Sequence, residues 1–144
     1  MPTVSGMQQR LNVLTLGVDA VGRARSFYEA LGWNIGFTDG DIVMFQAGPM
    51  IISLWDRAKL AADSGVQEGT GWGGFTMGYA VGDAAEVDEV CRRAAEAGAA
   101  VTAGPQDKGF GYSGVFADPD GHTWEVAWIE ALRRHPDGTV ELPS

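Results

Sequence analysis

Apolar and polar residues alternate along segment 12–18, and this alternation predicts a β-strand with Leu14, Leu16 and Val18 on one face. From residue 19 the apolar spacing changes to three and four, which predicts a helix with Asp19 as its N-cap and Gly32 as its C-terminal stop. Segments 41–48 and 50–57 then predict two strands joined by a turn. The first part of the chain therefore has the order strand, helix, strand, strand.

The same order returns in the second part of the chain. Segment 74–81 again predicts a strand. Asp83, with Glu86 three residues later, forms a capping-box pattern, and the helix that it opens ends at Gly98. Three strand or turn segments follow, over 99–106, 112–120 and 122–128. A unit that occurs only twice indicates a duplicated module rather than a repeat array.

The predicted elements divide the chain into parts of one domain, 1–144. Between two modules, 11–58 and 74–129, lies a connector, 59–73, and a tail, 130–144, follows the second module. The length of 144 residues is sufficient for one compact core. The Gly-rich connector predicts a mobile segment, long enough to have a function.

The composition excludes several classes of protein. The net charge of −9 argues against a nucleic-acid partner, whose phosphates need a basic surface. The apolar runs are too short for a membrane span, so we expect no membrane partner. The first ten residues lack the pattern of a secretion signal, and a single cysteine, Cys91, fits a reducing compartment. We therefore expect a cytoplasmic protein.

Three segments together carry a family resemblance: "TLGVDAVGRARSFYEALGW", "AVGDAAEVDEVCRRAAEAGAAV" and "GYSGVFADPDGHTWEVAW". Over residues 11–129 the chain resembles the vicinal oxygen chelate superfamily, which includes glyoxalase I, extradiol dioxygenases and bleomycin-resistance proteins. The resemblance implies an α+β fold of two tandem β-α-β-β-β modules, whose curved mixed sheets surround a cavity. It also implies a homodimer.

Enzymes of this superfamily hold a divalent metal in the cavity with His and Glu side chains. The resemblance places Val13, Thr76 and Glu125 at these positions. Valine has no lone pair, and a threonine hydroxyl is a poor ligand for transition metals. His122 is predicted on the strand face opposite Glu125, and His135 lies in the tail. We therefore expect no metal and no other cofactor, with a divalent metal at Glu125 as the alternative.

Glu125 is a lone acid in the apolar run of the last predicted strand. The resemblance implies that residues 123, 125 and 127 face the cavity and that residues 124, 126 and 128 face a helix. A carboxylate in an apolar cavity must be paired, hydrogen-bonded or protonated. Three interpretations stay open: an anchor for a cationic or hydrogen-bonding ligand, an acid/base catalyst, or a carboxylate satisfied by backbone donors or water.

Aromatic and small polar side chains are candidates to line the cavity beside Glu125. Aromatic walls with a few polar groups are typical of small-molecule pockets, and a flat ring near an acid suits a cationic or planar ligand. The candidates for ligand binding are Glu125, Trp55, Trp72, Phe110, Tyr112, Ser53 and Thr76.

These features favour a metal-free protein that binds a small cationic or aromatic molecule in the cavity and performs no chemistry. It would be similar to the antibiotic-sequestering members of the superfamily. The alternative is an enzyme of the same superfamily. That enzyme would be a metal-dependent lyase, isomerase or dioxygenase, or a metal-free acid/base catalyst that uses Glu125. The sequence leaves open whether the protein is an enzyme.

Overall fold

The computed structural model describes residues 6–143 as two four-stranded sheets, one two-stranded hairpin and three helices. The first sheet has the order β1-β4-β3-β2, in which β1 and β4 are parallel and the other neighbours are antiparallel. Helix α1 (Val21–Ala30) connects β1 to β2. The strands of this sheet are β1 (Val13–Val18), β2 (Phe37–Asp39), β3 (Ile42–Ala47) and β4 (Met50–Asp56).

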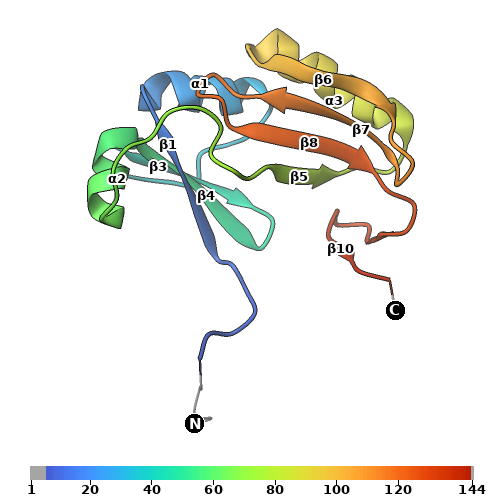
Figure 1. Cartoon of the computed structure of the whole chain (residues 1–144), viewed down its shortest axis with the longest axis horizontal. Helices are drawn as coiled ribbons and strands as arrows, with labels where there is room; N and C mark the ends of the chain where they lie inside the picture. The colour runs from blue at the N-terminus through green and yellow to red at the C-terminus, as the bar shows by residue number, and fades with distance from the viewer. Residues whose placement is uncertain (1–5, 144) are drawn as a thin grey trace.

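The second sheet repeats this topology in the order β5-β8-β7-β6, with β5 and β8 parallel. Helix α3 (Ala84–Ala97) connects β5 to β6. The strands are β5 (Met77–Ala80), β6 (Ala100–Asp107), β7 (Tyr112–Ala117) and β8 (Thr123–Trp128). The α+β fold with two β-α-β-β-β units is thus confirmed. Figure 1 shows the sheets as open and curved, with α1 and α3 on the same side of them.

One apolar core joins both units. Trp33 of the first unit and Trp124 of the second pack edge to face, with ring centroids 5.7 Å apart. Tyr28 packs against both rings and is fully buried. The predicted alternation is confirmed in the packing of the sheets. The apolar face of each sheet packs against its connecting helix, α1 or α3, and α2 lies against β1 and β4 at Gly17, on the other face of the first sheet.

The connector differs from the sequence prediction. Residues Arg57–Ser64 form helix α2, which starts within the predicted first module and continues into the predicted mobile connector. Asp56 caps this helix by accepting a hydrogen bond from the Lys59 amide, and Gly65 ends it with a φ of 73°. The helix buries none of its residues. It therefore needs no apolar stripe, and without such a stripe the sequence pattern does not identify it as a helix.

Two further differences are local. β5 begins at Met77, later than the predicted residue 74, and β2 was not predicted. The tail forms a hairpin of β9 (Arg133–Arg134) and β10 (Val140–Glu141). In the part of the chain that the structure describes, no helix has both the length and the apolar character needed to cross a membrane.

Candidate functional site

Glu125 lies on the face of the second sheet opposite α3, because its neighbours Trp124 and Val126 are buried in the core on the helix side. Its Oε2 accepts a hydrogen bond from the Ser113 hydroxyl at 2.9 Å. The Lys108 ammonium lies 3.4 Å from the same oxygen. The Glu125 side chain is 33% exposed. The carboxylate is therefore both hydrogen-bonded and paired, which was one of the conditions expected from the sequence.

Lys108 and Ser113 were not among the candidates from the sequence. Lys108 reaches Glu125 because a tight turn folds the loop after β6 back: the Lys108 amide donates to the Gly111 carbonyl at 2.8 Å. The Gly109 amide donates to the Asp107 carboxylate at 2.8 Å. The glycine spacing of "DKGFG" is the one signal in the sequence for such a turn.

Thr76 and Trp72 lie at one end of the same sheet face. The hydroxyls of Thr76 and Thr123 are 2.7 Å apart, and the Trp72 indole N–H donates to the Thr123 hydroxyl at 3.3 Å. Thr123 is two residues before Glu125 and therefore shares its face. Phe110, in the loop that carries Lys108, is 54% exposed. These three candidates thus lie near the predicted anchor or in the loop beside it.

The structure places the remaining candidates elsewhere. The Ser53 hydroxyl donates to the Thr15 hydroxyl at 3.0 Å on the first sheet. The Trp55 indole donates to Asp41 at 3.2 Å, also on the first sheet. Within residues 6–143, no hydrogen bond joins either group to Glu125.

Tyr112 points away from the open face. Its hydroxyl donates to the Asp88 carboxylate of α3 at 2.7 Å. This hydrogen bond, with the Asp88 charge, raises the pKa of Tyr112. The hydroxyl is therefore on the helix side of the sheet, opposite Glu125.

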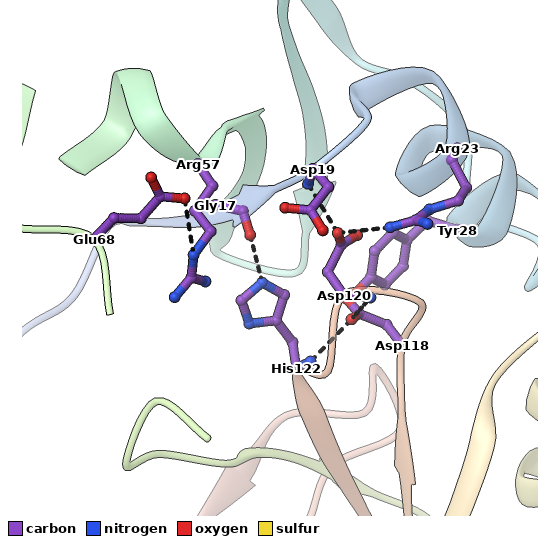
Figure 2. A network of polar contacts seen from close by, with 9 residues as sticks. All are labelled: Gly17, Asp19, Arg23, Tyr28, Arg57, Glu68, Asp118, Asp120 and His122. Atoms are coloured by element: carbon purple, nitrogen blue, oxygen red, sulfur yellow. Dashed lines mark hydrogen bonds and ion pairs between the residues drawn. The ribbon is translucent and has the colours of Figure 1, made fainter. Parts of the chain in front are cut away.

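The "DPDGHTW" turn between β7 and β8 has a structural role (Figure 2). Asp118 is buried, and its Oδ1 accepts hydrogen bonds from the amides of Asp120 and His122, both at 2.9 Å. Its Oδ2 accepts a hydrogen bond from the Tyr28 hydroxyl at 2.7 Å, and that hydroxyl accepts one from the Trp124 indole at 3.1 Å. Burial, and then the Asp118 charge, raise the pKa of Tyr28 well above its usual value. The turn is thereby attached to α1.

Asp120 fixes the same turn to the loop between β1 and α1. Its Oδ1 accepts hydrogen bonds from the Asp19 amide and the Arg23 guanidinium, both at 2.9 Å. The prediction that Asp19 caps α1 is wrong: Ala20 occupies the N-cap position without a side-chain bond, and Asp120 binds the Asp19 amide instead. His122 adds a second contact, 2.8 Å from Nε2 to the Gly17 carbonyl oxygen.

A cleft of about 470 Å³ lies beside this junction. Arg57 holds its connector wall: the guanidinium pairs with Glu68 at 3.3 Å and donates to the Gly69 carbonyl at 2.7 Å. Glu125 is not part of this cleft, which is therefore a different place from the predicted site. The lining residues are Gly17, Asp19, Arg57, Glu68, Gly69, Thr70, Gly71 and Asp120.

The fold agrees with comparisons to known proteins. The family model of the Glyoxalase/Bleomycin resistance protein/Dioxygenase superfamily matches residues 10–126, and the chain belongs to that superfamily. A glyoxalase-related enzyme from Fulvimarina pelagi is similar in structure, with a TM-score of 0.88 and 28% identity over 95% of this chain and 100% of that one. No curated protein matches the sequence.

Two other solved structures extend this picture. A hypothetical protein from S. aureus has a TM-score of 0.76 and 27% identity, over 86% of this chain and 96% of that one. A lactoylglutathione lyase from Agrobacterium tumefaciens has a TM-score of 0.64 and 22% identity, over 84% of this chain and 94% of that one. The second likeness shows the shared fold alone.

The donor set around Glu125 does not fit the divalent metal that members of this superfamily often use. Val13 offers no donor atom, and the Thr76 hydroxyl is bonded to Thr123. The Lys108 ammonium beside the Glu125 carboxylate opposes a second cation there. Among the residues that the structure describes, no group of three or more His, Cys, Asp or Glu side chains is arranged to hold a metal ion.

Proposed function

We propose that this protein binds a small organic molecule, without a metal, on the open face of the second sheet around Glu125. The observation that carries the proposal is the group formed by Glu125, Ser113 and Lys108. A carboxylate and an ammonium lie side by side on an open sheet face, and both are partly exposed. Such a pair presents one acceptor and one donor to a ligand.

The ligand class follows from the charges and from the neighbouring rings. Lys108 already supplies Glu125 with a positive charge, so a purely cationic ligand would have to displace it. An aromatic molecule with a polar group can instead bind to both partners. Trp72 and Phe110, which are 65% and 54% exposed, offer ring surface for it. The contact with Lys108 thus favours the aromatic over the cationic ligand.

We further propose that the chain forms a homodimer. Each edge strand of the two large sheets carries a large apolar side chain that is at least 40% exposed: Val13 on β1, Phe37 on β2, Tyr79 on β5 and Val101 on β6. Exposed apolar edges are unfavourable in a monomer and are commonly covered by another chain. A second copy would protect them and enclose the open faces.

The test is a ligand screen by thermal shift on tag-free protein, with small aromatic molecules that carry a hydroxyl, carboxyl or amine group. Hits are repeated by calorimetric titration with Glu125→Gln and Lys108→Met. We expect each variant to weaken binding about tenfold or more, since each removes one charged partner. Glu130→Gln, an exposed acid just after β8, is the matched control and should bind like the parent protein. Equal binding by all variants would contradict the proposal.

A titration with Zn²⁺, Ni²⁺, Mn²⁺ and, anaerobically, Fe²⁺ tests the metal-free part. We expect no site in chelator-treated protein. Binding of one metal per chain at micromolar concentration, lost in Glu125→Ala, would replace the proposal with a metal enzyme of the superfamily.

One observation favours a second candidate, a metal-free acid/base catalyst. Oε1 of Glu125 accepts no hydrogen bond within residues 6–143, while Oε2 is held by Ser113. A fixed carboxylate with one free, partly exposed oxygen is suited to accept a proton from a bound molecule. For this candidate, Glu125→Gln would abolish turnover of a hit compound while its binding stays intact. A turnover that survives this substitution would exclude it.

A further inference from the structure

We propose a second ligand site, for a protonated primary amine, in the cleft between the β1–α1 loop, the connector and the β7–β8 turn. Asp19, Glu68 and Asp120 line this cleft together with backbone groups of Gly69 and Gly71. The site is independent of Glu125, which does not line it, and it does not rest on the proposed function above.

Asp120 provides the observation that points to a ligand. Its side chain is only 4% exposed, so nearly all of the carboxylate is removed from water. Oδ1 accepts two hydrogen bonds, from the Asp19 amide and the Arg23 guanidinium. Oδ2 is buried and accepts no hydrogen bond within the described residues. A buried carboxylate oxygen without a donor is rare and unfavourable, and an incoming N–H group would satisfy it.

The Asp19 carboxylate lies on the same side of the cleft (Figure 2). It accepts no hydrogen bond from residues 6–143, and its backbone amide is already bound to Asp120. The carboxylates of Asp19 and Asp120 belong to two loops that this hydrogen bond holds together, and two carboxylates near each other repel unless a positive group lies between them. Arg23 neutralises Asp120 only from the α1 side and is itself half exposed.

The positive group inside the cleft is already engaged. The Arg57 guanidinium pairs with Glu68 and donates to the Gly69 carbonyl, so it holds the connector wall and leaves Asp19 and Asp120 without a partner from this side. An ammonium group is compact and has three donors, which suits two carboxylates on one wall.

The shape of the cleft indicates an organic amine rather than a metal ion. The volume of about 470 Å³ is much larger than an ion needs and is within the range of small-molecule sites. Its connector wall contains Gly69, Thr70 and Gly71, which offer backbone donors and acceptors to the body of a ligand. In the described residues no group of three acidic, His or Cys side chains has metal-binding geometry.

The test compares cyclohexylmethylamine with cyclohexylmethanol, which have similar bodies and differ in the charged group. Each is titrated into ¹⁵N-labelled full-length protein, and backbone amide shifts are followed. We expect the amine, but not the alcohol, to shift the amides of Asp19 and of residues 69–71. The amides of β8 around Glu125 should stay in place.

Two variants and one control assign the effect. Asp19→Asn, whose carboxylate accepts no bond within the described chain, should fold normally and weaken amine binding about threefold or more. Asp120→Asn should weaken it at least tenfold, and its amide spectrum shows whether the fold is kept. Asp39→Asn, an exposed acid on β2, should bind the amine as the parent protein does.

Three outcomes would overturn the proposal: equal shifts with amine and alcohol, amine binding that Asp19→Asn leaves unchanged, or shifts confined to β8. Saturable binding of Ca²⁺ or Mg²⁺ at lower concentrations than the amine, lost in Asp19→Asn, would also overturn it and would make the cleft a cation site.

Discussion

Asp118 is a buried acid that adds hydrogen bonds to the apolar contacts at the junction of the two units. Its carboxylate accepts hydrogen bonds from two amides of its own turn and from the Tyr28 hydroxyl of α1. Tyr28 also accepts the indole N–H of Trp124. The hydrogen bonds from Tyr28 to Asp118 and from Trp124 to Tyr28 are buried, and an unpaired polar group is most costly in the interior. The network therefore depends on each of its members.

We predict that Tyr28→Phe lowers the free energy of unfolding by about 1–3 kcal/mol. The substitution keeps the ring but leaves Asp118 Oδ2 and the Trp124 indole without their partner. Urea unfolding followed by circular dichroism measures the change. Tyr79→Phe is the control, because Tyr79 is half exposed and should change the stability little. Equal effects of the two variants would contradict a role for the hydroxyl network.

We also predict that the protein loses stability at alkaline pH because of the buried Tyr28 hydroxyl. Burial raises its pKa in the folded protein above the ordinary 10.0, so the folded state keeps a proton that the unfolded state releases. The stabilisation is complete below about pH 10 and decreases as the pH rises further, by up to about 1.4 kcal/mol per pH unit. Urea unfolding between pH 8 and 11 should therefore show a steeper decline for the parent protein than for Tyr28→Phe. Parallel declines would exclude this contribution.

At the scale of elements, the two long helices begin in different ways. Asp83 accepts the Glu86 amide at 2.8 Å, and the Glu86 carboxylate accepts the Gly82 amide at 2.9 Å, so the start of α3 is capped locally. The start of α1 has no side-chain cap of its own. Its preceding loop is held by Asp120, which follows Asp19 by 101 residues.

We predict that Asp83→Ala lowers the free energy of unfolding by about 1 kcal/mol, the usual value of a lost N-cap. Asp19→Ala should change it little or increase it slightly, because Asp19 caps nothing and lies beside the Asp120 carboxylate. Thermal unfolding of both variants measures the difference. A larger loss in Asp19→Ala than in Asp83→Ala would show that the assignment of caps is wrong.

The packing of α3 on the second sheet depends on Gly114 of β7. A methyl group at this position would lie 2.9 Å from the Cys91 sulfur and 3.0 Å from Cγ of Pro105. We predict that Gly114→Ala lowers the free energy of unfolding by about 1–3 kcal/mol, since helix and strand would have to separate. Gly104→Ala on β6 is the matched control, because a methyl group there meets nothing within 4 Å. Chemical unfolding measures the stability of both variants. Equal stability of Gly114→Ala and Gly104→Ala would contradict the close packing at Gly114.

At the scale of the whole molecule, the open sheets predict a dimer. Light scattering during size exclusion should give twice the chain mass at micromolar concentrations. The substitutions Val13→Lys and Tyr79→Lys, on edge strands β1 and β5, should shift the protein toward the monomer. Each would bury a charge in the proposed interface between the two copies. Leu142→Lys, in the exposed tail, is the control. A monomeric parent protein would refute the proposed dimer.

Much of the fold could be predicted because its signals are local. Alternation specifies β1 and β4, and the capping box at Asp83 with the stop at Gly98 defines α3, since a few neighbouring residues suffice. Helix α2 could not be predicted because it lacks such a local signal. It buries no side chain, so no apolar stripe marks it, although Asp56 and Gly65 are suitable caps.

The candidate site could be predicted only in part. The resemblance implied that Glu125 faces away from the helix-side residues Trp124 and Val126, and both of these are buried in the structure. Its partner Lys108 could not be foreseen, because the contact spans 17 residues and depends on how a glycine-rich loop folds back. Trp55 was grouped with Glu125 from a strand pattern and Tyr112 from its place in a predicted loop, and the structure bonds both to other elements.

The sequence by itself determined the two-unit α+β fold, the superfamily and the position of one acid on an open sheet face, because periodicity, caps and a short turn motif are properties of neighbouring residues. Only the tertiary structure decided the partners of the acids. Whether Asp120 holds a loop, Asp118 a tyrosine or Glu125 a lysine depends on groups that lie far apart in the chain and meet only when the two sheets and their helices pack on one core.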